Sequence, residues 1–432
     1  MSDEASKKTP RPSRRGFLSA AGGLVAAGGL SLTAQAAAPV STDVPPKGAV
    51  AGAAEPFWGA RQGGILTPSQ SHTYFAAFDL VTTKREDVAK LMKLWTEAAA
   101  RLAQGQPAAP FGTDLEKASG DSGEAIGLPP ARLTLTFGFG PGLFMTKDGH
   151  DRYGLAKLRP EALVDLPRFN GDQLAPTHTG GDLSVQACAD DPQIAFHAVR
   201  QLAAMAYDIA ELRWVQAGFS AKAAGEKNPR NLMGFKDGTR QPDKDKLDAR
   251  VWVGSEGPAW AQGGSYLVVR RIRISLEHWD RMNVDFQEKT IGRHKYSGAP
   301  LGKKHEYDEV DLDATNADGE PVLPENSHVR LSHASSNDGA EILRRGYSYN
   351  DGVAFTAERW PPWKQGMLYD AGLLFIAYQR DPRTGFIKIF GNSSKFDMLN
   401  QFATHVGSGI FLCPPGAKPG GYIGQSLFES AA

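Results

Sequence analysis

The sequence has little cysteine and no excess of charge of either sign. Its 432 residues include two cysteines, Cys188 and Cys413, and 48 basic residues balance 48 acidic ones. Two thiols are too few for a disulfide framework or a four-thiolate metal site, so we expect both to be buried and free. Balanced charge argues against a broad basic surface for nucleic acid or anionic membranes. Partners are therefore recognised at particular sites.

The short motifs of zinc sites are also missing. Neither an HExxH motif nor a pair of CxxC motifs occurs. His328 and His333, in PENSHVRLSHA, are five positions apart, which places them on different faces of a helix or a strand and makes them poor ligands of one ion. Isolated histidines such as His150 and His197 are typical of surface or packed positions. A single neutral imidazole such as that of His328, however, suits the axial position of a haem iron.

The first 38 residues have the pattern of an export leader. Arg14 and Arg15 precede a weakly apolar run of small residues that ends in Ala-Gln-Ala. This pattern indicates a twin-arginine (Tat) signal peptide over residues 1–38, with a membrane anchor as the alternative. Because the Tat pathway exports folded proteins, often with a cofactor inserted, we predict a cofactor-bearing protein in the periplasm or an equivalent extracytoplasmic space. Residues 39–64, rich in Pro, Ala and Gly, indicate an N-terminal arm.

The rest of the chain repeats one order of strands and helices. In the first half, SHTYFAAFDLVTT, RLTLTFGFG and DLSVQACADD predict strands, REDVAKLMKLWTEAA predicts an amphipathic helix, and a second helix begins at Pro192. In the second half, GGSYLVVRRIRI, GLLFIAYQRD and GIFLCPPG predict strands, and helices are expected after Ser275, as a cap, and near residues 394–402. We therefore predict an α+β fold of tandem ferredoxin-like domains with antiparallel sheets, over residues 65–220 and 221–432.

Two further stretches carry chemistry. NLMGFKDGTRQP places Asp237 between Gly234 and Gly238, which suits a turn that holds a carboxylate against a flat ligand. The alternative is an Asx turn before a proline, with no ligand at all. AEILRRGYSYNDG supplies adjacent arginines, Arg344 and Arg345, for which surface ion pairs are the alternative role.

Together these segments resemble the dye-decolourising peroxidases. GFKDGT matches the GxxDG motif of that family, and LTFGFGPGLF, NSHVRLSHA and ILRRGYSY are similar to further family segments, from about residue 60 to about residue 430. The leader and the LRRGYSY form are most similar to the exported, EfeB-like deferrochelatase/peroxidase branch. The resemblance implies one haem b per chain, held between sheet and helices of tandem ferredoxin-like domains. The related chlorite dismutase architecture also holds haem, but it lacks the GxxDG aspartate.

The resemblance also implies roles for individual residues. His328 corresponds to the axial ligand of the haem iron, Asp237 to the distal carboxylate and Arg344 to the distal arginine. The other residues expected beside the cofactor are Gly234, Gly238 and Arg345. A carboxylate that accepts a hydrogen bond from the far nitrogen of His328 is expected at Asp381 or Asp397. Cys413, which precedes a proline, is the alternative axial ligand.

These roles define the expected chemistry. Asp237 moves a proton between the two oxygens of bound hydrogen peroxide, and Arg344 stabilises the charge that accumulates as they separate. The resemblance implies an acidic pH optimum. We expect organic dyes, phenols or ferrous iron as electron donors, and a homodimer that binds no nucleic acid.

Two other functions stay open at this stage. One is a haem-binding or deferrochelatase component of an extracytoplasmic iron-uptake system, in which haem is cargo and other uptake components are the expected partners. Passive haem carriage needs no proton shuttle beside a fixed cation, so Asp237 and Arg344 favour the enzyme. The other is a ferredoxin-like binding module without haem.

Overall fold

The computed structural model describes residues 52–112, 116, 119–357 and 365–430. The predicted signal peptide, with its twin arginines, and residues 39–51 of the predicted arm lie outside this part of the chain. Within it, no helix is both long and apolar enough to cross a membrane. The described residues form one unit, and the predicted domain limits at residues 65–220 and 221–432 stay a prediction.

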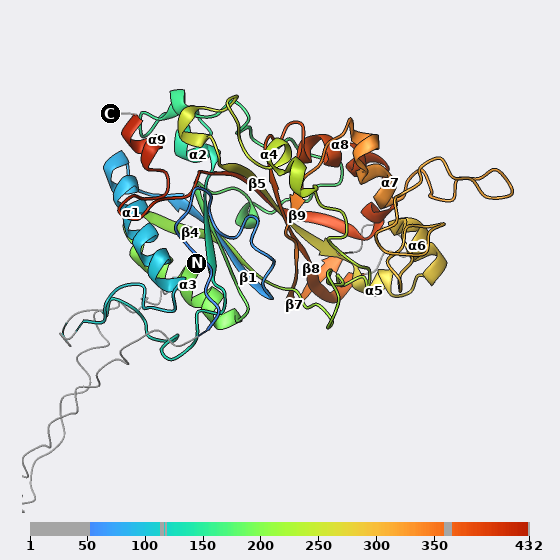
Figure 1. Cartoon of the computed structure of the whole chain (residues 1–432), viewed down its shortest axis with the longest axis horizontal. Coiled ribbons are helices and arrows are strands. Elements are labelled where there is room, and N and C mark those ends of the chain that lie inside the picture. Colours follow the sequence, from blue (N-terminus) through green and yellow to red (C-terminus); the bar gives the residue numbers. More distant parts are fainter. Residues whose placement is uncertain (1–51, 113–115, 117–118, 358–364, 431–432) are drawn as a thin grey trace, which may run out of the picture. The chain divides into compact units, whose positions relative to one another are not determined.

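The first half is a β-α-β-β-α-β unit (Figure 1). Its elements are β1 (His72–Leu80), α1 (Arg85–Leu102), β2 (Thr134–Phe139), α2 (Pro141–Phe144), β3 (Leu183–Ala189), α3 (Pro192–Met205) and β4 (Ala210–Phe219). The strands pair antiparallel in the order β4-β1-β3-β2. Pro192 begins α3 as predicted, and Asp191 caps it by accepting the N–H groups of Gln193 and Ile194.

The second half repeats this topology with additional short elements. The helices and strands of the second half are, in chain order, α4 (Leu247–Arg250), β5 (Ser265–Ile274), α5 (Leu276–Trp279), α6 (Val284–Ile291), α7 (His328–Ser332), β6 (Leu343–Arg344), β7 (Tyr347–Ala357), β8 (Gln365–Gln379), α8 (Phe386–Phe396), β9 (Ala403–Cys413) and α9 (Gln425–Ser430). The order β9-β5-β8-β7 corresponds strand for strand to β4-β1-β3-β2 of the first half. The predicted tandem of ferredoxin-like units is therefore confirmed.

Strand β1 shows why its sequence does not alternate between apolar and polar residues. Ala76, Phe78 and Leu80 pack in the core that contains α1 and α3, whereas Phe75 and Ala77 point to the opposite face and enter a second core. Both faces are buried, so every position in the middle of the strand is apolar.

This second core joins the two sheets. Its large members, from both halves, include Phe75, Trp214, Trp252, Tyr347, Tyr378 and Phe411. Backbone pairing between the halves is sparse, because β4 meets β7 only at Phe219 and Ser348, and β2 meets β9 only at Phe139 and Leu412. Side-chain packing therefore holds the sheets together. Cys188 and Cys413 lie in this core and are buried and free, as expected.

Two predicted helices of the second half differ from the structure. The helix after Ser275 is a single turn, and the Ser275 side chain makes no capping bond; the longer α6 begins after Asn283, whose side chain accepts the N–H of Phe286. The helix predicted near residues 394–402 begins earlier, as α8, and ends before Asp397. There the Asp397 carboxylate accepts the N–H of Leu399 and starts a new 3-10 turn (Met398–Gln401), which separates the two elements.

Candidate active site

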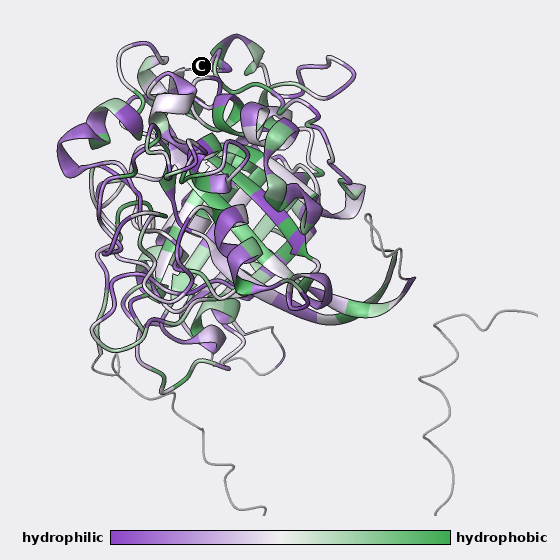
Figure 2. Cartoon of the chain, turned by 90° about the vertical axis from the view of Figure 1, so that its right-hand side faces the viewer, coloured by the Kyte–Doolittle hydropathy of each residue, from purple (hydrophilic) through white to green (hydrophobic). Residues whose placement is uncertain are grey.

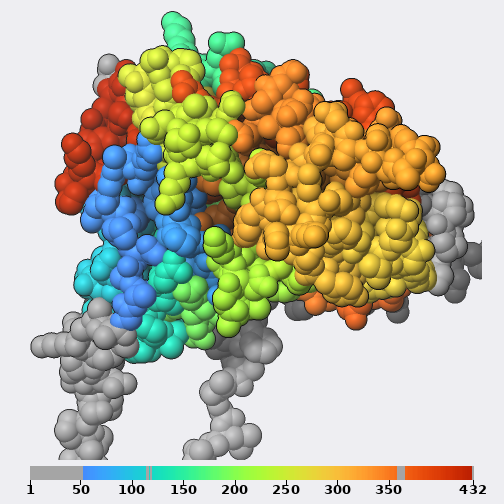
Figure 3. Space-filling view, turned by 45° about the vertical axis from the view of Figure 1, so that its right-hand side comes forward, coloured from blue at the N-terminus to red at the C-terminus, as the bar shows by residue number. Residues whose placement is uncertain are grey.

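A cavity of about 250 Å3 lies between residues 65–69 and the second half of the chain. Its walls come from residues 65–69, from the segment 227–241 and from the segment 343–346 around β6. Figure 3 shows the hollow between the N-terminal part, in blue, and the green-to-orange second half. The cavity therefore depends on segments that are far apart in the sequence.

The turn that contains Asp237 is organised by Asn231. The Asn231 side chain accepts the N–H groups of Met233 and Phe235, and the backbone N–H of Asp237 donates to Pro229 O at 2.9 Å. Gly234 and Gly238 have φ angles of 86° and 91°, a region that L side chains rarely adopt. The two glycines thus allow the turn that aims the Asp237 carboxylate at the cavity.

Asp237 and Arg344 face each other at the cavity wall. Arg344 Nη1 lies 3.5 Å from Asp237 Oδ1, and their side chains are 30% and 26% exposed. A contact of this length is weak and leaves both groups able to interact with a third molecule. The Asp237 carboxylate pairs with a guanidinium, whereas the Asx-turn alternative would need it to accept a nearby backbone N–H.

Gln241 fixes the backbone of Arg344 from both sides. Its Oε1 accepts the N–H of Arg344 at 2.8 Å, and its Nε2 donates to Arg344 O at 3.0 Å. The Arg344 guanidinium also donates to Arg240 O at 3.0 Å. The sequence analysis missed Gln241, although it lies in the same stretch as Asp237.

His328 begins α7 and is oriented by a buried carboxylate. Its Nδ1 lies 2.6 Å from Asp397 Oδ2, and Asp397 is only 3% exposed whereas the His328 side chain is 38% exposed. Because Asp397 Oδ1 is already bound by the N–H of Leu399, the carboxylate is held on both oxygens. An ionised carboxylate accepts, so His328 donates from Nδ1 and keeps the Nε2 lone pair for a ligand.

The electrostatics connect His328 with the other two residues. Burial of the ring acts to lower the pKa of His328. The negative charge of Asp397 and its hydrogen bond outweigh burial and raise the pKa above the ordinary value of 6.5. Smaller effects on the same pKa come from Arg344, which lowers it, and from Asp237, which raises it. Asp237 and Arg344 therefore lie near enough to His328 to act on its pKa, although His328 is not among the residues that line the cavity.

The open choices of the sequence analysis are settled by contacts. Asp381 pairs with Arg383 at 2.8 Å, so Asp397 is the partner of His328. Cys413 is fully buried between the sheets, and burial raises the pKa of its thiol far above the usual range, which disfavours a thiolate ligand. Within the described ranges, no cluster of three His, Cys, Asp or Glu side chains would hold a metal ion.

Arg345 lies beside Arg344 but is engaged elsewhere. Arg345 is buried, and its guanidinium donates to Thr67 O and to the side chain of Gln70. These bonds connect the cavity wall at residues 65–69 to the end of strand β6. A side chain at Gly234 would press on Lys295, whereas Gly238 lines the cavity. The positions of Gly234, Gly238 and Arg345 beside a cofactor stay predictions.

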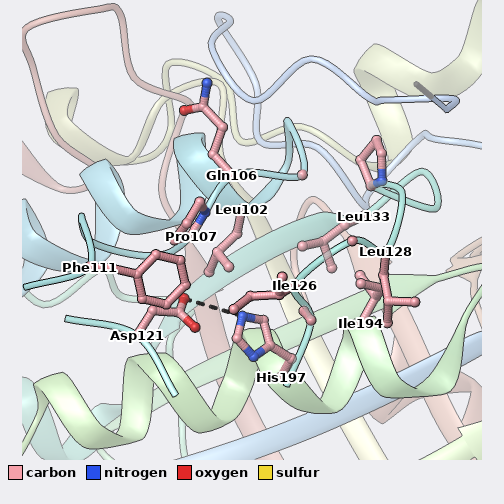
Figure 4. A pocket seen from close by; sticks show the side chains of 14 residues that line it. Leu102, Gln106, Pro107, Phe111, Asp121, Ile126, Leu128, Leu133, Ile194 and His197 are labelled. Carbon is pink, nitrogen blue, oxygen red and sulfur yellow. Dashed lines mark ion pairs between the residues drawn. The ribbon is translucent and has the colours of Figure 1, made fainter. Parts of the chain in front are cut away.

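A second, smaller cavity of about 60 Å3 lies in the first half (Figure 4). Its walls are mostly apolar, with Leu102, Leu133 and Ile194 among them, and His197 and Asp121 close one side. His197 Nε2 lies 3.4 Å from Asp121 Oδ2, and Nδ1 lies 3.1 Å from Glu124 Oε1. Both ring nitrogens are occupied by the protein, so this cavity is the weaker candidate for chemistry.

Family models match both halves of the chain. The N-terminal model of the Dyp-type peroxidases matches residues 62–220, and the C-terminal model of the same family matches residues 228–418. The second match contains Asp237, Gln241, His328, Arg344 and Asp397, whereas the wall at residues 65–69 lies in the first.

Individual relatives agree with the family models. The chain is 40% identical over 388 residues to a dye-decolorizing peroxidase of Thermobifida fusca, which covers 86% of this chain and 84% of that protein. It is 36% identical over 436 residues to a deferrochelatase of Escherichia coli K12, which covers 97% of each. Ferric DtpA from Streptomyces lividans matches with a TM-score of 0.78 at 40% identity, over 87% of this chain and 97% of that one. The chain therefore belongs to the Dyp-type peroxidase family.

Proposed function

We propose that this protein is a haem peroxidase that uses hydrogen peroxide to oxidise a reducing substrate, with Asp237 as the acid/base group and Arg344 as the charge-stabilising cation. Membership of the Dyp-type peroxidase family supports the activity. The observation that carries the proposal is the Asp237–Arg344 pair, 3.5 Å apart on a cavity wall and electrostatically coupled to His328.

The residues present fit haem as the cofactor. His328 donates from Nδ1 to Asp397, so its Nε2 would be available to hold the haem iron, and the ring is partly exposed. The negative charge of Asp397 makes the imidazole a stronger donor toward iron. When bound, haem supplies the iron centre at which peroxide is activated.

Asp237 is placed to move the proton. Cleavage of the O–O bond requires a proton to leave one peroxide oxygen and reach the departing one, which a carboxylate can do by accepting and then donating it. An acidic pH optimum is expected from the family and belongs to this proposal.

Arg344 is placed to stabilise charge. Its guanidinium is a fixed cation that lines the same cavity as Asp237, where it would stabilise the negative charge that accumulates as the peroxide oxygens separate. Gln241 limits the movement of the Arg344 backbone through two hydrogen bonds, so that the cation is in place before peroxide binds.

A second candidate function is a haem-binding or deferrochelatase component of an extracytoplasmic iron-uptake system. The match to the deferrochelatase of Escherichia coli K12 covers 97% of this chain. In this role ferrous iron or haem iron replaces dyes and phenols as substrate. The twin arginines support periplasmic or otherwise extracytoplasmic location after Tat export.

Stopped-flow absorption tests the proposal. Haem-loaded protein is mixed with a small excess of hydrogen peroxide, and the Soret band is followed in the native protein, Asp237→Asn and Arg344→Leu. We expect a rapid change in the native protein and a change about 100-fold slower or more in either variant. If haem binds but peroxide leaves the Soret band unchanged, the peroxidase assignment is wrong and haem or iron handling takes its place.

A further inference from the structure

The charge of the cavity beside Asp237 differs from that of the whole chain. The whole chain has equal numbers of basic and acidic residues, 48 of each. Figure 2 shows that the central strands are mainly hydrophobic, in green, whereas the loops around them, which supply most of the cavity wall, are richer in hydrophilic residues, in purple. Of the described residues that line the cavity, Asp237 is the one acid and five are basic: Lys222, Lys227, Arg230, Arg344 and Arg345. A concave wall with an excess of one charge raises the local concentration of ions of the opposite sign, so this cavity should attract anions.

Most of this positive charge is not cancelled by the cavity wall itself. Asp237 faces Arg344 and offsets that one cation. Arg230 donates to three backbone carbonyls, at 2.6–2.9 Å, and Arg345 donates to a backbone carbonyl and to a glutamine side chain. None of these described acceptors is a carboxylate, so both guanidinium charges still act on the cavity.

The two lysines of the cavity wall are available to a ligand. Both are exposed, and within the described part of the chain neither ammonium group forms an ion pair. Lys227 Nζ lies 5.3 Å from the centre of the Tyr307 ring, an uncharged neighbour. Glu226, which lies between the lysines in sequence, pairs instead with Lys236. Lys222 and Lys227 can therefore bind an anion without first giving up a carboxylate of the protein.

The volume of the cavity limits the size of that anion. A cavity of about 150 Å3 holds benzene, and pockets for larger, drug-sized molecules begin at about 300 Å3. At about 250 Å3 this cavity fits one substituted aromatic ring and is too small for a dye of several rings. Its wall also carries the hydroxyls of Ser69, Ser220 and Ser348, which make no hydrogen bond within the described chain and can bind polar substituents of such a ring.

We propose that this cavity binds a small anionic electron donor, a single-ring phenol that carries a carboxylate, and that Lys222 and Lys227 hold the carboxylate. The ring then occupies the part of the cavity that Asp237 and Arg344 line. The inference rests on the proposed peroxidase function, which consumes the donor. Two phenols each lose one electron and the hydroxyl proton, and one hydrogen peroxide takes up both electrons and both protons to become two molecules of water.

Steady-state kinetics of the haem-loaded full chain test the proposal with two matched donors, ferulate and its uncharged methyl ester. The native protein should have the lower KM for ferulate, and the double variant Lys222→Gln/Lys227→Gln should reduce this preference by about tenfold. Comparing the ratio of KM values between proteins cancels the different reactivity of the two phenols. Lys147→Gln is the control, because Lys147 is exposed but does not line the cavity. The same KM ratio in the native protein and the double variant overturns the proposal.

Calorimetric titration with 3,4-dimethoxycinnamate gives a second readout that needs no turnover, because this carboxylate has no phenolic hydroxyl to oxidise. It should bind the haem-loaded native protein and Lys147→Gln alike, about tenfold more weakly to the double lysine variant, and more weakly as salt is raised. Binding that persists although peroxide leaves the Soret band unchanged would support the anion site while the peroxidase function fails. Loss of haem from the double lysine variant would assign the lysines to the carboxylates of haem itself and reject the donor site.

Discussion

His197 on α3 and His328 at the start of α7 each lie against a buried aspartate, one in each half of the molecule. His197 is 4% exposed, and both of its ring nitrogens face carboxylates, of Asp121 and Glu124. His328 is 38% exposed and has only Nδ1 engaged, by Asp397. Carboxylates raise the pKa of both histidines, against the lowering effect of burial, so pKa does not separate the two sites. What separates them is the number of ring nitrogens left for a ligand.

The comparison explains how similar residues serve different purposes. The first arrangement, here called the clasp, consists of His197, Asp121 and Glu124. It holds the segment that carries the two carboxylates against α3. The second is open, because its carboxylate orients the ring without blocking it. A search for perturbed histidines alone would select both, and geometry is needed to choose between them.

The largest expected difference is between the two histidine substitutions. His328→Ala should abolish the Soret absorbance of protein purified with one equivalent of haem, because it removes the proposed ligand of the haem iron. His197→Gln should retain the Soret band and peroxidase turnover while losing about 1–3 kcal/mol of unfolding free energy, because buried carboxylates lose their partner. Absorption spectra and urea unfolding of both variants check this, and loss of haem in His197→Gln would break the comparison.

Substitution of the partner carboxylates should give a smaller effect. Asp397→Asn keeps the size of the side chain but removes the charge that orients His328, so we expect haem affinity or turnover to fall by about 10–100-fold. Asp121→Asn, the matched change in the clasp, should leave both unchanged. Haem titration and steady-state kinetics provide the measurement. Equal losses in the two variants would show that both act through general stability.

Two glutamines allow a finer test. Gln241→Ala should lower turnover by about tenfold with little change in haem binding, because it releases the Arg344 backbone. Gln201→Ala is the control, since Gln201 Nε2 lies 3.4 Å from His197 Nδ1 in the clasp. Rescue by Gln241→Glu is not expected, because a carboxylate cannot donate to Arg344 O. Turnover that is unaffected in Gln241→Ala would remove its positioning role.

The smallest effect concerns pH. Because the pKa of His197 is raised in the folded state, its stabilisation is complete below the ordinary value of 6.5 and is lost as pH rises through the higher folded value. The pKa values of Asp121 and Glu124 are lowered by hydrogen bonds and by His197, against burial, so their contribution is present above 3.8 and 4.5 and is lost as pH falls. The clasp is therefore strongest between about pH 4.5 and 6.5.

Hydrogen exchange measures the pH effect directly. After correction for intrinsic rates, exchange around Asp121 and Glu124 should increase from pH 6.5 toward pH 9 in the native protein. In His197→Gln it should be faster throughout and show little further increase above pH 6.5. The segment around His328 serves as the internal reference. A native profile parallel to that of His197→Gln above pH 6.5 would mean that the histidine charge does not hold the clasp.

Part of this picture was predictable from the sequence. Apolar runs and helical spacing predicted most strands and both long helices of the first half, because local patterns reflect burial directly. The motifs around Asp237, His328 and Arg344 predicted three site residues; the structure brings Asp237 and Arg344 to within 3.5 Å of each other, and the roles of all three stay predictions. The short α5 was not predictable, since Ser275 has the residue type of a cap but not its hydrogen bond.

Other features depend on contacts between distant segments. Asp397 is 69 positions from His328, and only the packing of α7 beside α8 selects it over Asp381. The ion pair of Asp381 with Arg383, two residues on, was a local signal that could have removed it from consideration. Gln241 acts on Arg344 from 103 positions away, so its role appears only in the folded chain.

The wall at residues 65–69 has a consequence for the order of events during synthesis. Arg345 holds Thr67 across 278 positions of sequence, and Gln62 donates to Pro414 O across 352. Loops of this length close only when nearly the whole chain has left the ribosome. The cavity wall is therefore expected to close late in synthesis, and a chain that ends before Arg345 would lack the contact that holds Thr67.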